Sequence, residues 1–324
     1  MLRNYEIKAH SYPFFEGTYN STLMFVGIDH GTTAIRFATH EKVMKIPRQN
    51  GFFFDIQTFA SHFPLDEIRG IALTYSMGDN FSAISSIDHL VNRGVISQKG
   101  AGEHIGGGTK VFDTFLESDL PVIVIPGIHK NSPTDPRFKI YSHQASPEKV
   151  GIAYYLSQVV GPDIIMCDAS SNTVSLLIKD GKVVGGFDAC VFAPGRIHGA
   201  LDVEAIRAVD AGEMSANDAF LRAGTHTKCE NMLSESEKMR SLAMFSAMEC
   251  AALRLLAPHA KIALCGSLAQ DLHAEVSHLL DQEVLVFDEW VAARGLCMIA
   301  EAVYHGKREV VGLHVCAHAI ERCV

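Results

Sequence analysis

A short polar turn after an apolar run is the part of this 324-residue sequence best suited to chemistry. The string GIDHGTTAIRFA covers residues 27–38. Asp29 ends the apolar run, where its carboxylate could hold Mg²⁺ directly or through water. Gly31 would let backbone amides approach phosphate oxygens, and Thr32 and Thr33 add hydroxyl donors. The turn therefore predicts a site for a phosphate tail and a metal ion, although an ordinary hairpin with an Asx turn has the same pattern.

The pattern returns in the second half of the chain, which predicts a duplicated fold. Asp168 again ends an apolar run, and Ser170, Ser171 and Asn172 follow it. In both copies another apolar strand, a polar turn and a third strand come next. The second of these turns contains Asp180-Gly181, a strong hairpin signal because both residue types tolerate positive φ. Each copy is thus predicted to begin with a meander of three antiparallel strands.

Helices and buried strands are expected after each meander, so that two related α/β domains face each other. Interior strands are expected at residues 70–74 and 121–125, and a helix at 147–159. In the second half, helices are expected at 201–210, 215–222, 234–256 and 289–304, with strands at 261–264 and 283–287.

Composition excludes several classes of protein. The formal net charge of −9 opposes a broad nucleic-acid surface, which needs clustered Lys and Arg, but does not exclude ATP. The eight scattered cysteines include no CxxC pair, which is typical of reduced thiols in a cytoplasm. Residues 1–19 have no continuous apolar core and no apolar run is long enough to cross a bilayer. We therefore expect a cytoplasmic protein with no membrane or nucleic-acid partner.

The first turn resembles the first phosphate motif of the actin/heat-shock-protein/sugar-kinase (ASKHA) superfamily. Later segments resemble acetate and butyrate kinases in the same order: YSHQASPEKV at 141–150, DASSNTVSLLIKDGKVVGGFDACVFAPGRIHGALDVEA at 168–205, ALCGSLAQD at 263–271 and FDEWVAARG at 287–295. The whole chain also resembles an uncharacterised archaeal family known as a methanogenesis marker. The resemblance implies two duplicated RNase H-like domains enclosing a nucleotide cleft.

The resemblance also implies a role for each matching position. His143 would hydrogen-bond the transferred phosphoryl group, and Arg196 would stabilise charge in the transition state. Asp168, the third catalytic candidate, would orient the metal. Mg²⁺ would be held by Asp29, Asp168, Asp288 and Glu289. ATP would contact Asp29, Gly31, Thr32, Thr33, Ser170, Ser171, Asn172, Gly266 and Ser267. Plainer roles remain open: His143 and Asp288 could cap helices, and Arg196 could tie down a loop.

Departures from the kinase pattern restrict the expected substrate. The second turn has no glycine where the superfamily usually has one, and side chains there keep the backbone farther from phosphate. The segment TYSMGDN, residues 74–80, lacks an Arg that would anchor a carboxylate. Acetate itself is therefore not the expected substrate.

The expected function is ATP-dependent phosphoryl transfer to a small molecule, with a carboxylate as first candidate because it needs no general base. An alcohol acceptor would need one, for which Asp79 is the candidate. The alternatives are a non-catalytic ATP sensor or assembly factor, and a relative that binds no nucleotide. We expect an N-terminal extension (1–20), two domains (21–162 and 163–300) and a C-terminal segment (301–324) that packs towards the first. A homodimer is left open.

Overall fold

The structure is a computed structural model that describes residues 23–74, 80–90 and 107–323. The extension predicted for residues 1–20 and the base candidate Asp79 lie outside these ranges.

The first sheet begins with the predicted meander. Its strands are β1 (Met24–His30), β2 (Ala34–Ala38), β3 (Val43–Pro47), β4 (Ile68–Thr74), β5 (Ser85–Ser86) and β6 (Val122–Ile125). The order across the sheet is β3-β2-β1-β4-β6-β5. The strands β1, β2 and β3 pair antiparallel, whereas β4 lies parallel to β1 and β6 lies parallel to β4.

The second sheet repeats the first five strands of this arrangement and has no counterpart of β5 among the described residues. Its strands are β9 (Ile164–Ala169), β10 (Thr173–Lys179), β11 (Lys182–Phe187), β12 (Lys261–Cys265) and β13 (Leu285–Val286), in the order β11-β10-β9-β12-β13. The meander is antiparallel, and β12 and β13 continue in parallel from β9. Asp180 and Gly181 have φ of 53° and 72°, as their hairpin requires. The five strands that the two sheets share, in the same order and directions, confirm the predicted fold class of duplicated RNase H-like α/β units.

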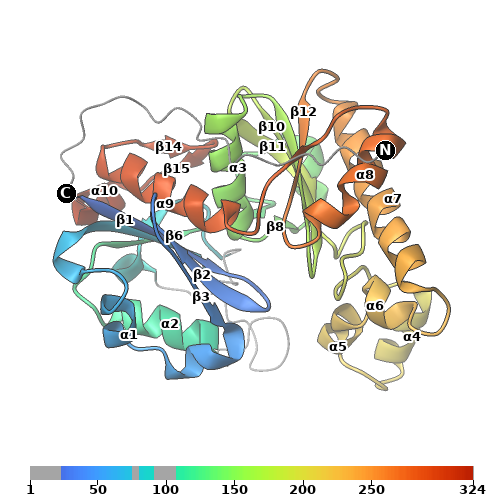
Figure 1. The fold of residues 1–324 in the computed structure, drawn as a ribbon, viewed down its shortest axis with the longest axis horizontal. Helices are drawn as coiled ribbons and strands as arrows, with labels where there is room; N and C mark the ends of the chain where they lie inside the picture. The colour runs from blue at the N-terminus through green and yellow to red at the C-terminus, as the bar shows by residue number, and fades with distance from the viewer. Residues whose placement is uncertain (1–22, 75–79, 91–106, 324) are drawn as a thin grey trace, which may run out of the picture.

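Helices lie on both faces of each sheet, which gives five layers (Figure 1). Between the sheets, α9 (Val291–Tyr304) packs on β1 and β4, and α3 (Glu148–Val159) packs on β9 and β10. The two helices also pack on each other. The outer layers are α1 (Ile56–Ala60) and α2 (Gly107–Leu116) on the first sheet, and α7 (Glu235–Arg254) and α8 (Ala269–Leu280) on the second.

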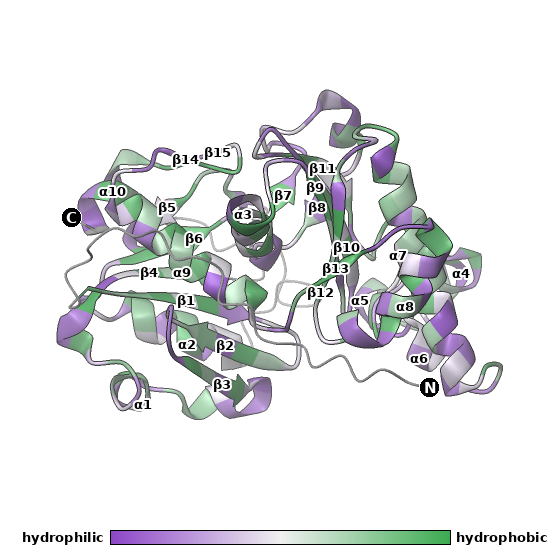
Figure 2. Cartoon of the chain, turned by 45° about the horizontal axis from the view of Figure 1, so that its top comes forward, coloured by the Kyte–Doolittle hydropathy of each residue, from purple (hydrophilic) through white to green (hydrophobic). Residues whose placement is uncertain are grey.

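One apolar cluster lies between the two sheets, and one more lies on the outer side of each sheet. In Figure 2 the hydrophobic colour follows the strands and α9. The central cluster joins residues of both sheets, such as Phe25 and Met166, through α9 residues such as Leu296. Outside the first sheet, Phe59 meets Phe115 edge to face with ring centroids 5.0 Å apart. Burial in all three clusters stabilises the arrangement that positions the two polar turns.

The α3–α9 contact depends on two glycines. A β-carbon on Gly295 would collide with the carbonyl group of Gly151, and one on Gly151 would lie 2.7 Å from the carbonyl oxygen of Ala292. Side chains at either position would force the helices apart. The backbones of the two central helices therefore touch directly.

The remaining elements are short. They are η1 (Arg48–Phe53), η2 (Leu65–Glu67), η4 (Ile87–His89), β7 (Ile128–His129), η5 (Pro136–Ile140), β8 (His143–Ala145), α4 (Val203–Asp210), α5 (Ala216–Leu221), α6 (Thr225–Lys228), β14 (Glu309–Val310), β15 (Leu313–His314) and α10 (Ala317–Cys323). Arg322 of α10 forms an ion pair of 2.7 Å with Asp88, beside β5. In the described part of the chain, no helix is long and apolar enough to cross a membrane.

Candidate functional site

A pocket of about 240 Å³ lies between the two sheets, at the first turn of α3. Both polar turns line it, together with the segment around Arg196 and the loop after β12. Apart from Asp79, which lies outside the described residues, every residue that the sequence singled out for catalysis, nucleotide binding or metal binding lines this pocket except His143 and Asp288.

The β1–β2 turn presents a buried carboxylate to the pocket. The side chain of Asp29 is 6% exposed, and its Oδ2 lies 3.6 Å from Nη1 of Arg36. Its Oδ1 has no hydrogen-bond partner among the described residues. Burial, then the charge of Glu148, raises the pKa of Asp29 to about 7. A buried oxygen without a partner is costly, so this atom is suited to a ligand that the chain does not itself supply.

Hydrogen bonds from Arg48, the first residue of η1, hold the backbone of the first turn in place. Nη1 of Arg48 donates to the carbonyl oxygen of Gly31 (2.9 Å), and the Arg48 amide donates to that of Thr33 (3.0 Å). The side chains of Thr32 and Thr33 stay exposed at the pocket. The turn is therefore fixed while its hydroxyls remain available.

The donor set fits Mg²⁺ if phosphate supplies most of the coordination. No group of three or more His, Cys, Asp or Glu suited to a metal occurs among the described residues. Mg²⁺, however, usually binds one or two carboxylates and completes its octahedron with phosphate oxygens and water. Asp29, with its unpaired Oδ1, meets that requirement.

The β9–β10 turn holds its aspartate differently. Oδ2 of Asp168 lies 2.8 Å from Nζ of Lys149, and its Oδ1 accepts a bond of 3.2 Å from the Ser170 hydroxyl. Gly266 has φ of +91°, and a β-carbon there would collide with Oδ1 of Asp168. Both oxygens of Asp168 therefore have partners within the protein, and only glycine fits at position 266 beside it.

An ion pair at the start of α3 lies beside the aspartate of the second turn. Lys149, 5% exposed, also lies 2.8 Å from Oε1 of Glu148, which accepts a bond of 2.6 Å from the Ser146 hydroxyl. Burial opposes both charges, but the attraction outweighs it. The pKa of Lys149 is raised by Asp168 and Glu148, and that of Glu148 is lowered by Lys149. Both groups are thus charged in the pocket.

The backbone of Arg196 forms hydrogen bonds with two neighbouring segments. Its amide donates to the carbonyl oxygen of Ser170 (3.0 Å), and its carbonyl oxygen accepts from the amide of His226 (3.0 Å). The side chain lines the pocket together with Thr32 and Thr33 from the opposite sheet. The backbone of Arg196 is therefore held in place at the edge of the pocket.

Two predicted residues lie elsewhere. His143, on β8, has Nε2 3.4 Å from Oδ2 of Asp188 and does not line the pocket. Asp288 accepts a bond of 2.9 Å from the Trp290 amide and pairs with Arg294 at 3.0 Å. It thus stabilises the turn before α9, whereas the N-cap of α9 itself is Trp290 and has no side-chain hydrogen bond.

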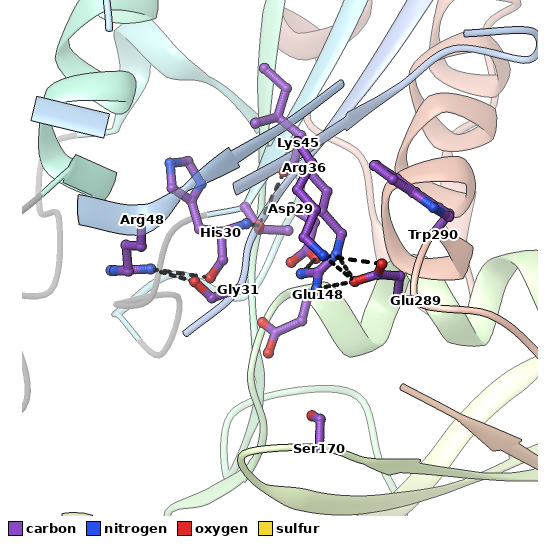
Figure 3. A network of polar contacts seen from close by, with 12 residues as sticks. Asp29, His30, Gly31, Arg36, Lys45, Arg48, Glu148, Ser170, Glu289 and Trp290 are labelled. Atoms are coloured by element: carbon purple, nitrogen blue, oxygen red, sulfur yellow. Dashed lines mark hydrogen bonds and ion pairs between the residues drawn. The ribbon is translucent and has the colours of Figure 1, made fainter. Parts of the chain in front are cut away.

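Glu289 lines the pocket, but cations already surround it. Its Oε2 lies 2.6 Å from Nη2 of Arg36 and 2.8 Å from Nζ of Lys45, on β2 and β3 (Figure 3). Burial favours the neutral acid, but these bonds lower the pKa of Glu289. The carboxylate connects the start of α9 to the first sheet, so we no longer assign it to the metal.

Sequence reasoning missed three charged residues of the pocket: Arg36, Glu148 and Lys149. Arg36 was inside the quoted phosphate motif, and Glu148 and Lys149 were in the first turn of a predicted helix. A Glu-Lys pair at the start of a mostly apolar predicted helix was the available signal, because buried charges require partners.

Comparisons with known proteins identify relatives along nearly the whole chain. No family model matches the sequence. The UPF0285 protein of Methanosarcina acetivorans is 40% identical over 322 residues, covering 90% of this chain and 99% of the relative. The UPF0285 protein of Methanocaldococcus jannaschii is 40% identical over 328 residues with the same coverage.

Solved structures are similar only at a low level. A glucokinase of the ROK family from Streptomyces griseus, in complex with glucose and AMPPNP, has a TM-score of 0.47, 12% identity, and 86% and 99% coverage. The activator of 2-hydroxyisocaproyl-CoA dehydratase from Clostridium difficile, with bound ADPNP, has a TM-score of 0.46, 12% identity, and 89% and 99% coverage. We draw no conclusion from these two, and the fold assignment rests on strand order. The identity and coverage of its archaeal relatives show that this chain belongs to the UPF0285 family.

Proposed function

We propose that the pocket binds ATP with Mg²⁺ and that the protein transfers the terminal phosphoryl group to a small molecule. One observation carries the proposal: a single pocket contains Asp29 with its unpaired oxygen, the Thr32-Thr33 hydroxyls, and Arg196 from the opposite side. Phosphoryl transfer depends on positioning and charge stabilisation more than on covalent chemistry by the protein. These groups supply both.

Each residue has a defined task in this proposal. Asp29 holds the metal, and the fixed β1–β2 turn directs its hydroxyls at the phosphates. Mg²⁺ at Asp29 would neutralise charge on the β- and γ-phosphates. Arg196 stabilises the negative charge on the oxygens of the group in transfer. Gly266 and Ser267, in the loop after β12, lie where the nucleoside end would leave the pocket.

The acceptor is the less defined part of the proposal. A carboxylate remains the first candidate because it is a nucleophile without deprotonation. His143, paired with Asp188, is kept out of the transfer step in this scheme. The assignment to an acetate or butyrate kinase-like branch rests on motif order alone, so the acceptor should be sought among small carboxylic acids generally.

The test is a calorimetric titration with ATP, with and without Mg²⁺, of the wild type and of Asp29→Ala. We expect Mg²⁺ to strengthen binding in the wild type and to have almost no effect in the variant. Asp288→Ala is a matched control, because this acidic side chain lies outside the pocket. Equal Mg²⁺ dependence in the wild type and Asp29→Ala would refute the proposed site.

A second function, a nucleotide sensor without turnover, is favoured by the ion pairs of Glu289. They join the start of α9 to β2 and β3 beside the pocket, so a bound nucleotide could alter them. Phosphate release and acceptor phosphorylation, measured in the same preparation that binds ATP, separate the two functions. Binding without turnover supports the sensor.

A further inference from the structure

The second turn offers a phosphate fewer backbone donors than a glycine-rich loop does. The amide of Ser170 donates to the carbonyl oxygen of Asn172 (2.8 Å), so it is already used. The carbonyl oxygens of Ser170 and Ser171 accept from the amides of Arg196 and Ile197, each at 3.0 Å, which fixes the turn against the Arg196 segment. A donor from outside the turn would complete a phosphate site on this side of the pocket.

Lys149 has the geometry for that task. Its Nζ lies 2.8 Å from Oδ2 of Asp168 and 2.8 Å from Oε1 of Glu148, and the residue lines the pocket. An ammonium group has three donors. Two are used by these carboxylates, and they are its hydrogen-bond partners within the described residues. A third N–H remains for a ligand.

The charges around the pocket indicate what that ligand is. On the α3 side, Glu148 and Asp168 would repel a polyphosphate if no cation lay between them. Arg36 is engaged by Glu289, which leaves Lys149 and Arg196 as the cations of this half. Figure 3 shows Ser170 lying across from Asp29, Arg36 and Glu148, so a ligand that spans the pocket meets both groups.

We propose that Lys149 is a direct ligand of the polyphosphate and replaces the missing glycine amides of the second turn. The inference rests on the proposed function in that it takes a nucleotide as the ligand. The ligand is, by chemical class, a linear polyphosphate of two or more phosphates, held through N–H···O bonds from Nζ of Lys149. Glu148 and Asp168 position Lys149 and leave its charge in place. Part of the affinity for ATP is therefore independent of metal.

The test is calorimetric titration in EDTA with ATP, AMP and inorganic tripolyphosphate, on the wild type, Lys149→Met and Lys149→Arg. We expect Lys149→Met to weaken ATP and tripolyphosphate by about tenfold or more, since bonds to charged groups are the stronger ones. AMP should change by less than about twofold, because its one phosphate does not span the pocket. Lys149→Arg should restore part of the loss.

Removing Lys149 alone leaves two buried carboxylates without their cation, which could unfold the protein. The double variant Glu148→Gln with Lys149→Met removes one charge of each sign and is the second measurement, checked by circular dichroism. Wild-type affinity for tripolyphosphate in the folded double variant would overturn the inference. So would a wild type that binds Mg²⁺-ATP but no tripolyphosphate in EDTA, and this result would leave the proposed function intact. A wild type that binds ATP under neither condition would refute both.

Discussion

The two polar turns occupy the same place in the five strands that the two sheets share, yet the surroundings of their aspartates differ. In the first turn, one oxygen of Asp29 has no hydrogen-bond partner in the described part of the chain, and Arg48 donates a hydrogen bond to the backbone of Gly31. In the second, Asp168 is paired with Lys149 and bonded by Ser170. The repeated topology thus fixes where the carboxylates lie, and the neighbouring side chains decide what each carboxylate can do.

This difference suggests a division of labour in the proposed reaction. The first turn would bind the metal and supply hydroxyls, and the second side would supply fixed cations. Glycine is needed where backbone must approach the ligand, and it is dispensable where a lysine reaches in from a neighbouring helix. Four experiments test this division.

The largest effect is expected at the second side. Arg196→Ala should slow turnover about a thousandfold, the range associated with charge-stabilising arginines in phosphoryl transfer. Affinity for ATP should change by less than about threefold, because this contact forms mainly in the transition state. The measurements are steady-state kinetics and calorimetry, with the exposed Arg222→Ala as control. Unchanged turnover in Arg196→Ala would favour the sensor.

The next effect compares the two aspartates directly. Asp29→Asn should reduce the Mg²⁺-dependent gain in ATP affinity by about a hundredfold, the upper end for groups that hold a metal through its outer shell. Asp168→Asn should reduce that gain by less than about tenfold, because Lys149 already neutralises Asp168. Mn²⁺ titration followed by electron paramagnetic resonance measures both. Equal losses would end the proposed division of labour.

A smaller effect is expected on restoring a glycine to the second turn. Ser170→Gly removes the hydroxyl bond to Asp168 and should weaken ATP binding by less than about tenfold. Binding should not become stronger, since the amide at this position is bonded to Asn172. Fluorescence titration with a labelled nucleotide is sufficient. Tighter binding would show that the turn can open its amides to a ligand.

The smallest effect is an effect on stability, expected at the turn between the second and third strands of the first meander. His40, on the β2–β3 turn, has its pKa raised to about 10, by a bond with Cys297 and by Glu301, 3.0 Å away. A raised pKa adds stability that is complete below about pH 6.5 and is lost as the pH rises to about 10. The β10–β11 turn is held by a backbone bond from Gly181 to Pro162.

Scanning calorimetry at pH 6.5 and pH 10 should therefore show a decrease in melting temperature that is smaller in His40→Gln than in the wild type. The same decrease in both proteins would mean that His40 contributes nothing to this pH dependence.

Local signals were sufficient to predict most of the fold. The meanders follow from apolar strands that end in Asp and from the Asp180-Gly181 hairpin, all of which act over a few residues. The helix predicted at 234–256 is α7, and Ser234 and Glu237 form its capping box. The strand predicted at 283–287 is shorter, with only Leu285–Val286 paired, because β12 is its single neighbour at the sheet edge.

The site was harder to predict, because its charges pair across the chain. Glu289 was a plausible metal ligand until the fold placed it against Lys45, 244 residues earlier in the sequence. Lys149 could equally have been on a helix surface, and only the position of β9 puts Asp168 beside it. Motif order located His143 along the chain, but pairing of β8 with β7 sets the side chain beside Asp188.

The position of α9 has a consequence for the order of folding during synthesis. The thiol of Cys297 donates to the carbonyl oxygen of Phe25 (3.2 Å), and α9 covers the inner face of the first sheet. The ribosome completes β6 at Ile125 but reaches the end of α9 only at Tyr304. At roughly 5–20 residues per second, that interval takes about ten to forty seconds. Throughout it, the apolar face of the first sheet lacks its covering helix, so this sheet can complete its burial only after α9 has been made.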